Sequence, residues 1–249
     1  MLAKHGHTLL IHGRSEAKLA NAKHQLSELS GVGNIETYQA DLTKMSDVTK
    51  LAKEITDKHS SLDVLINNAG VYTTPSPLTD QGLDVRFVVN TLAPYLLTQQ
   101  IAPLMSATGR VINLSSAAQS TVDLDALRGK VKLDIAGQAY AQRKLAITMW
   151  SFYLAQKNQK DWPSIIAVNP GSLLASKMVK DAYGIEGKRL SLGAEILVKA
   201  ALDDEFSKAS GKYYDNDNNT FAAPHEDAHN PEKNIALVQT IESLLQRLA

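Results

Sequence analysis

The sequence predicts an α/β protein built on a doubly wound parallel sheet with helices on both faces. Short, β-branched-rich apolar segments, typical of strands covered on both faces, alternate with longer segments whose apolar residues recur at helical spacing. Strands that alternate with helices form parallel sheets through right-handed crossovers. The 249 residues suffice for one core of this kind, and no repeat or linker divides them. We therefore expect a single domain, residues 1–249.

The expected elements follow one another along the whole chain. Five strands are predicted, at residues 8–11, 35–39, 64–66, 111–114 and 165–168. Helical spacing predicts helices at 15–29, 44–58, 80–105, 138–158 and 232–248. Val48, Leu51 and Ile55 share one stripe of the second helix, and Ser15 and Ser46 are candidate caps of the first two. The polar segment 215–231 is expected to be an ordered surface loop before the last helix, with a disordered tail as the alternative.

Composition argues against several classes of function. Lys plus Arg and Asp plus Glu both number 26, so net charge gives no reason to expect a nucleic-acid or acidic-membrane partner. The absence of cysteine excludes disulfides and thiolate chemistry and suits a cytoplasmic protein. No apolar run reaches the roughly 18 residues that a membrane span needs. The 7 histidines show no convincing metal-ligand spacing, so we expect no metal.

Polar or glycine-containing segments follow all five predicted strands. They are residues 12–14, 41–42, 67–70, 115–116 and 169–171. Open parallel sheets bind ligands in the crevice at the carboxyl ends of their strands. We therefore expect the functional site at this edge of the sheet.

Tyr140 and Lys144 lie four residues apart on a predicted helix, so their side chains share one face. A free tyrosine has a pKa of about 10, too high for acid/base work near neutrality, and a neighbouring cation lowers that pKa. Tyr153 and Lys157 repeat the spacing, but they lie roughly 20 Å further along the same helix, away from the strand ends. Tyr140 is therefore the candidate acid/base.

Three other polar residues each allow a functional and a purely structural interpretation. Ser116 either presents its hydroxyl to a carbonyl oxygen or simply terminates a strand. Asn90 disfavours the helix interior, so it either kinks the helix and frees a carbonyl for a water chain or is a tolerated polar residue. Arg14 follows the first strand, where arginine accommodates the 2′-phosphate of NADP in dinucleotide-binding folds; a solvated surface arginine is the alternative.

Taken in order, these motifs resemble the short-chain dehydrogenase/reductase family over essentially the whole chain. The resemblance rests on Asn67-Asn68-Ala69-Gly70, Asn90, Ser116, Tyr140-Ala141-Gln142-Arg143-Lys144, Asn169-Pro170-Gly171 and the acidic-hydrophobic pair Asp41-Leu42. It implies a Rossmann-like fold and an NADP(H)-dependent oxidoreductase that interconverts a small-molecule carbonyl and an alcohol. It also implies a homodimer or homotetramer.

The roles of individual residues come from this resemblance. It implies that Tyr140 donates and accepts the proton, that Lys144 holds the nicotinamide ribose and that Ser116 orients the substrate oxygen. Asn90 would anchor a relay water. The other cofactor contacts would come from Arg14, Asp41, Leu42, Asn68, Ala69, Gly70, Pro170 and Gly171.

The sequence departs from the family pattern at its start. The family opens with a strand and a TGxxxGxG loop, whereas residues 1–6 look like the end of a helix. The first strand and the Gly-rich loop are therefore expected to be absent. That loop supplies backbone N–H groups to the cofactor pyrophosphate, so its absence would weaken cofactor binding.

Two further departures lie near the expected site. Ser116 and Tyr140 are 24 residues apart, and the extra segment 121–136 is similar to insertions in retinol dehydrogenases and protochlorophyllide reductases. The place of a family threonine is taken by Ala175, with Ser176 next, so the resemblance does not assign the family's carboxamide contact to Ser176. A substrate lid of partly apolar character is expected at about 173–190.

Two functions of different classes follow. One is hydride transfer between NADP(H) and a carbonyl or alcohol, with Tyr140 as acid/base. The other is a non-catalytic NADP(H)-binding or interaction protein that retains the fold. A serine hydrolase using Ser116 is disfavoured, because no GxSxG elbow is present.

Overall fold

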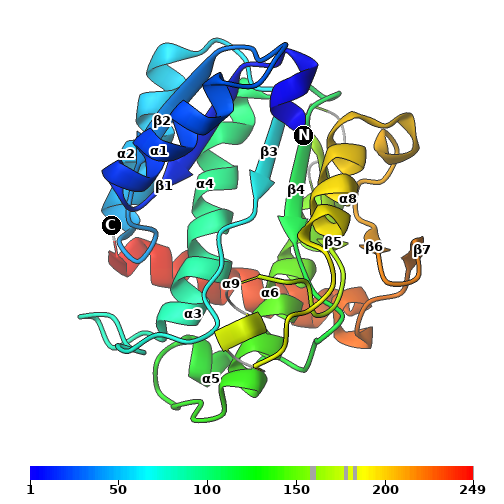
Figure 1. Ribbon diagram of the computed structural model, residues 1–249. Helices are drawn as coiled ribbons and strands as arrows, with labels where there is room; N and C mark the ends of the chain where they lie inside the picture. Colours follow the sequence, from blue (N-terminus) through cyan, green and yellow to red (C-terminus); the bar gives the residue numbers. More distant parts are fainter. Residues whose placement is uncertain (158–160, 177–178, 182–183, 249) are drawn as a thin grey trace.

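The computed structural model describes residues 1–157, 161–176, 179–181 and 184–248, and helices cover its sheets on both sides (Figure 1). Strands β1 (Leu9–Gly13) and β2 (Ile35–Gln39) pair in parallel as a two-stranded sheet. A second sheet has the order β3-β4-β5-β6-β7, and its strands are parallel except for β7, which pairs antiparallel with β6. These strands are β3 (Val64–Asn67), β4 (Arg110–Leu114), β5 (Ser164–Asn169), β6 (Tyr213–Asp215) and β7 (Thr220–Ala222).

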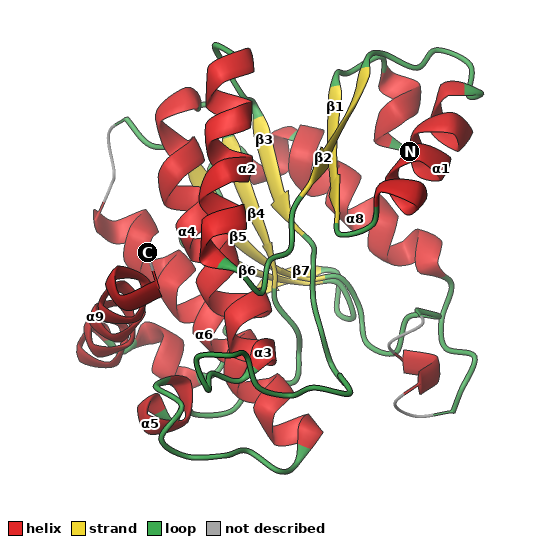
Figure 2. Ribbon diagram, turned by 90° about the vertical axis from the view of Figure 1, so that its left-hand side faces the viewer, coloured by secondary structure: helices red, strands yellow, loops and turns green. Residues whose placement is uncertain are grey.

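The two sheets stand beside each other, and in the described residues no strand pairing joins them (Figure 2). Every residue of β1 and of β3 is only half-buried, whereas every residue of β4 is buried. Strands inside a parallel sheet are normally covered by neighbours on both sides, so β1 and β3 resemble edge strands here. The predicted Rossmann-like, doubly wound α/β fold is confirmed, and in the described residues its strands form two sheets rather than one.

The helices predicted at 15–29, 44–58, 138–158 and 232–248 begin and end close to those bounds, whereas the helix at 190–202 was not predicted. The longer helices are α1 (Glu16–Ser27), α2 (Met45–Lys58), α4 (Ala93–Ile101), α6 (Ala136–Lys157), α8 (Leu190–Leu202) and α9 (Pro231–Leu248). The shorter ones are η1 (Leu2–His5), α3 (Val85–Phe87), η2 (Val88–Leu92), η3 (Ala102–Leu104), α5 (Leu124–Leu127), η4 (Asp204–Phe206) and η5 (Glu226–His229).

Successive side chains of the central strands point to opposite faces of the larger sheet, and each face is covered by an apolar core. Val111 and Ile165 lie in the larger apolar cluster, which α2, α4, α6 and α9 help to form. Their neighbours Ile112 and Ile166 point to the opposite face, into the cluster that includes α8 and β6. Both faces are apolar, which explains why these strands are continuous apolar runs in the sequence.

Of three expectations about where helices begin, one is confirmed and two are wrong. Ser15 caps α1, because its side chain accepts from the backbone N–H of Lys18 at 3.4 Å. Ser46 is not a cap; α2 begins at Met45, without a side-chain cap, so Ser46 lies in its first turn. The helix predicted at 80–105 begins only at Val85 and is interrupted by η2, a wider π-helical turn.

The polar segment 215–231 is ordered, as expected, but it is not only a loop. Residue 215 ends β6 and residues 220–222 form β7, so a hairpin closes the sheet. The turn between them contains Asn219 with a left-handed φ of 52°, a conformation that asparagine tolerates. The expected final helix is present as α9, and it packs against α6.

Candidate active site

A cavity of about 580 Å³ lies at the carboxyl ends of β3, β4 and β5. Its walls hold most of the residues that the sequence singled out: Asn68, Gly70, Asn90, Ser116, Tyr140, Lys144, Pro170 and Gly171. Parallel strands bring segments that are far apart in the sequence to this one edge. A phenol, an ammonium and a hydroxyl thus share one cavity.

Tyr140 and Lys144 occupy successive turns of α6, and both side chains reach the cavity. The Lys144 ammonium lies 5.7 Å from the centre of the Tyr140 ring. It donates a hydrogen bond to the backbone oxygen of Leu114, at the end of β4. Burial, and secondly the charge of Arg143, lower the pKa of Lys144 to about 7. The lysine is therefore held close to the phenol at a fixed point of the sheet edge.

Two consecutive serines at the end of β4 have different environments. Ser115 is buried, and its hydroxyl lies 2.6 Å from that of Thr148 on α6. Ser116 is half-exposed and lines the cavity, where its Oγ accepts from the Ala118 N–H at 3.1 Å. The Tyr213 hydroxyl donates to the Ser116 backbone oxygen at 3.1 Å and braces the turn. Ser116 is thus the serine placed to meet a substrate oxygen.

Asn90 lies in the π-helical turn η2 and is 2% exposed. Its side-chain amide forms two hydrogen bonds to the backbone of Val71: Oδ1 accepts from N–H at 2.8 Å, and Nδ2 donates to the oxygen at 3.1 Å. This pairing fastens the loop that follows β3, so that Gly70 stands on the cavity wall. The helix is widened to a π-helical turn at Asn90, whereas the expected kink and the role with a relay water stay predictions.

Two residues beside Tyr140 were not found by sequence reasoning. Tyr72 lines the cavity, and its ring centre lies 5.2 Å from that of Tyr140. Arg143 places its guanidinium 4.5 Å from the Tyr140 ring centre and 6.0 Å from that of Tyr72. The one signal available in the sequence was a second cation beside Lys144 in a largely apolar part of the helix.

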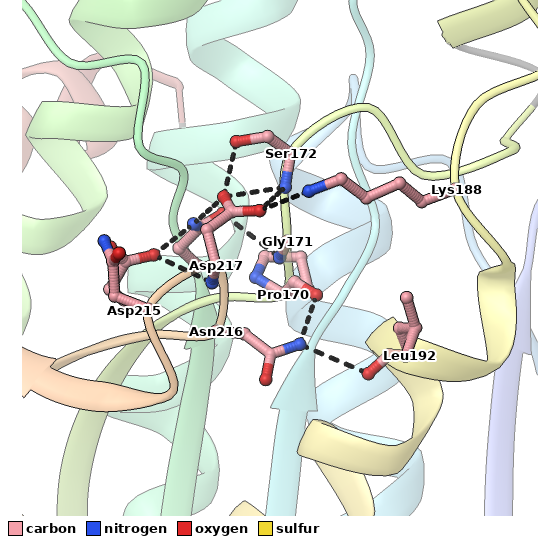
Figure 3. A network of polar contacts seen from close by, with 10 residues as sticks. Pro170, Gly171, Ser172, Lys188, Leu192, Asp215, Asn216 and Asp217 are labelled. Carbon is pink, nitrogen blue, oxygen red and sulfur yellow. Dashed lines mark hydrogen bonds and ion pairs between the residues drawn. The ribbon is translucent and has the colours of Figure 1, made fainter.

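Asp217, in the turn after β6, holds the segment that follows β5 (Figure 3). It accepts hydrogen bonds from the backbone and side chain of Ser172 and from Nδ2 of Asn169, and it pairs with the Lys188 ammonium at 2.9 Å. Burial by itself would raise the pKa of Asp217, but these hydrogen bonds outweigh it and hold the pKa well below its ordinary value. The strand-end turn carrying Gly171 is therefore anchored by an ionised carboxylate.

Asn216 supports the same segment from the side. Its Nδ2 donates to the oxygens of Pro170, at 2.9 Å, and of Leu192, at 3.3 Å (Figure 3). Gly171 has a φ of 118°, which side chains rarely tolerate. Together these contacts fix the course of the chain at the point where Pro170 and Gly171 border the cavity.

The remaining predicted cofactor residues lie elsewhere along the same edge. Arg14 is exposed and lines a second cavity, of about 430 Å³, together with Lys44. The Asp41 side chain accepts from the Thr43 N–H at 3.0 Å, and Leu42 is buried in the core at 8% exposure. Ala69 is exposed between Asn68 and Gly70 but does not line the larger cavity.

The model of one protein family, short chain dehydrogenase, matches residues 1–184. The chain belongs to this family. Human retinol dehydrogenase 13 is 28% identical over 232 residues, which span 86% of this chain and 70% of that protein. Polyprenol dehydrogenase of Danio rerio is 31% identical over 175 residues, 66% of this chain and 53% of that protein. The predicted family and its retinol dehydrogenase-like subgroup are thereby confirmed.

Solved structures share the short-chain dehydrogenase fold. A putative uncharacterized protein from Mycobacterium paratuberculosis superposes with a TM-score of 0.79 and 24% identity, over 98% of this chain and 86% of that one. The angucycline C-6 ketoreductase LanV, solved with bound NADP, has a TM-score of 0.64 and 21% identity, over 86% of each chain. At these identities the likeness shows the fold.

The segment 121–136, which lengthens the spacing between Ser116 and Tyr140, braces the start of α6. Arg86 forms a buried ion pair with Asp84 and donates to the Leu133 oxygen at 2.9 Å. Asp123 donates its N–H to the Gln142 side chain at 3.0 Å. In this member of the short-chain dehydrogenase family, the insertion therefore holds the helix that carries Tyr140.

The expected lid is described only in part, because Met178 and Tyr183 lie outside the described residues. Its base is closed by backbone bonds: the Lys188 N–H donates to the Leu173 oxygen, at 2.7 Å, and the Ala175 N–H to that of Lys188, at 2.6 Å. Ser176 lines the cavity, and its Oγ accepts from the Val179 N–H at 3.2 Å.

In the described residues, no helix has the length and apolar character of a membrane span.

Proposed function

We propose that this short-chain dehydrogenase is an NADP(H)-dependent oxidoreductase that interconverts a carbonyl and an alcohol, with Tyr140 as acid/base. The observation that carries the proposal is the shared cavity of Ser116, Tyr140 and Lys144. The relatives are named as retinol and polyprenol dehydrogenases, and one structural neighbour was solved with NADP. These names agree with carbonyl/alcohol chemistry.

The residues on the cavity wall fit a nicotinamide cofactor. Gly70 presents no side chain to the cavity, and a Cβ added there would make ordinary contact, at 3.8 Å, with the Asn90 side chain. Pro170 and Gly171 form a fixed, side-chain-poor surface on the opposite strand end. Arg14 and Lys44, which share the second cavity, are suited to a phosphate. When bound, the cofactor supplies or accepts the hydride.

The protein's own groups would then handle the oxygen and its proton. Ser116 donates a hydrogen bond to the substrate oxygen, and Tyr140 transfers a proton to that oxygen in reduction or removes it in oxidation. Lys144 favours the ionised phenol by its positive charge. These roles need only the hydroxyl, phenol and ammonium that the cavity brings together.

The cavity points to an apolar substrate. Besides its polar end, it is lined by Leu173, Leu174, Val179, Leu190 and Leu197. Leu173 and Leu190 are 45% and 54% exposed, so they present apolar surface to an incoming molecule. Burying that surface against an apolar chain would stabilise the complex.

NADPH oxidation with a panel of apolar aldehydes and ketones, followed at 340 nm, tests the proposal. Tyr140→Phe should lower kcat/KM at least about 100-fold while NADPH binding, followed by fluorescence, changes less than about threefold. Tyr153→Phe, on the same helix, is the matched control and should keep the parent's activity. Binding of NADPH without turnover of any carbonyl would instead support a non-catalytic NADP(H)-binding protein.

A further inference from the structure

Arg143 is a cation in the interior of the protein. It is 0% exposed, and none of its three side-chain nitrogens has a hydrogen-bond partner. Its guanidinium instead lies over two aromatic rings, 4.5 Å from the Tyr140 ring centre and 6.0 Å from that of Tyr72. Arg143 does not itself line the cavity, so it reaches the reaction only through these rings.

Such an environment is costly for the charge. A buried ion without a paired opposite charge loses its hydration and destabilises the folded protein. Cation–π contacts with the two rings offset only part of this loss. Burial lowers the pKa of Arg143 to about 9, which still leaves it charged at neutral pH.

Among the described residues, no carboxylate forms a hydrogen bond or an ion pair with the Arg143 guanidinium. The charge of Asp84 raises the pKa of Arg143, but this carboxylate is already engaged by Arg86 through both of its oxygens. In the described chain, the other charged or titratable groups that act on Arg143 or on the two rings are Lys144 on α6, Arg86 on α3 and Tyr213 on β6. Ionisation of the Tyr140 phenol would therefore give Arg143 the opposite charge that it lacks.

We propose that Arg143 is a positioning residue that stabilises the phenolate form of Tyr140 from the ring face, as a second cation beside Lys144. The two cations differ in their surroundings: Lys144 lines the cavity, whereas Arg143 is fully buried and does not line it. Any interaction by which the phenolate stabilises the guanidinium stabilises the phenolate equally, because the coupling between two sites is reciprocal. The proposed function enters this proposal at one point only: it assigns the ionised phenol a role as the base of the reaction.

The ionisation of Tyr140 can be measured without a substrate. With ¹³Cζ-labelled tyrosine, an NMR titration of the full chain follows each phenol separately, and the Tyr140→Phe variant identifies the signal. Arg143→Met should raise the pKa of Tyr140 by at least about one unit, because an opposite charge at this distance lowers a pKa by roughly 1–3 units. Arg143→Lys, which keeps the charge, should restore most of the shift.

The chain contains a matched control. Lys157 lies 5.5 Å from the Tyr153 ring centre on the same helix, but it is exposed. Lys157→Met should shift the pKa of Tyr153 by less than about 0.3 unit, because solvent screens exposed charges. Arg143→Gln repeats the measurement if the methionine variant folds poorly, and circular dichroism checks each fold.

The outcomes separate this inference from the proposed function. Equal titration of Tyr140 in the parent, Arg143→Met and Arg143→Gln proteins would overturn the role of Arg143, whether or not the protein reduces carbonyls. A shifted titration in a protein that turns over no carbonyl would leave the role of Arg143 standing and remove the proposed reaction.

Discussion

Lys144 donates a hydrogen bond to the backbone oxygen of Leu114, which ties the middle of α6 to the end of β4. Ser116 follows that strand end by two residues, and Tyr140 precedes Lys144 by one helical turn. One side-chain contact thus fixes the relative position of the strand and the helix that carry the two other groups of the site. Loss of the Lys144 contact should therefore lower both the catalytic activity and the stability of the protein.

Replacement of Lys144 should disable the site. Lys144→Met removes both the cation near the phenol and the link to Leu114, so we expect kcat/KM to fall at least about 100-fold. Steady-state NADPH oxidation measures this loss. Lys157→Met is the control on the same helix, and a comparable loss there would show that charge on α6 matters without regard to position.

The stability of the protein should depend on the pH through Lys144. Its pKa falls from the ordinary 10.5 to about 7 on folding, so between these values the unfolded chain binds more protons than the folded protein. Stability then rises with pH in that window. The Tm of the parent should rise relative to that of Lys144→Met between pH 7 and 9. A Tm difference between the parent and Lys144→Met that stays constant from pH 7 to 9 would contradict the lowered pKa of Lys144.

Replacement of Asp217 should loosen the strand-end turn that borders the cavity. Asp217→Asn removes the ionised acceptor of Ser172 and Lys188, and hydrogen bonds to charged groups contribute about 1.5–3 kcal/mol. We expect a lower Tm at neutral pH and a KM for NADPH that rises more than kcat falls. Because the pKa of Asp217 is held below its ordinary value, this contribution is present above pH 4 and is lost as acid protonates the carboxylate.

Asp204→Asn is the control for this measurement, since Asp204 is exposed in η4. Chemical denaturation at pH 7 and at pH 3 compares the variants. A difference between the parent and Asp217→Asn that is as large at pH 3 as at pH 7 would argue against an ionised anchor.

Arg14 should set the choice between NADPH and NADH. A guanidinium–phosphate contact is worth about 1.5–3 kcal/mol, so Arg14→Gln should weaken NADPH binding at least about tenfold and leave NADH binding nearly unchanged. Fluorescence titration with each cofactor gives the two affinities. Lys18→Gln, an exposed change on α1, is the control. Equal loss for both cofactors would place Arg14 away from the 2′-phosphate.

The sequence alone determined strands β1 to β5, helices α1, α2, α6 and α9, and the edge at which the site lies, but it did not indicate α8, β6 or β7. Local periodicity and residue type decide those features, because burial on one face of a helix or on both faces of a strand selects apolar residues at fixed spacing. Tyr140, Lys144 and Ser116 could be found for the same reason: their motifs lie within a turn of helix or at the end of a strand.

Tertiary structure decided which residues surround those groups. Arg143 and Tyr72 come together at Tyr140 from α6 and from the loop after β3, and Asp217 reaches Ser172 across 45 residues of sequence. The absence of pairing between β1 and β3 in the described chain likewise became visible only when the strands were placed. Such contacts depend on how elements distant in the sequence pack against each other. A local sequence pattern therefore does not predict which residues surround a buried charge or which strands pair.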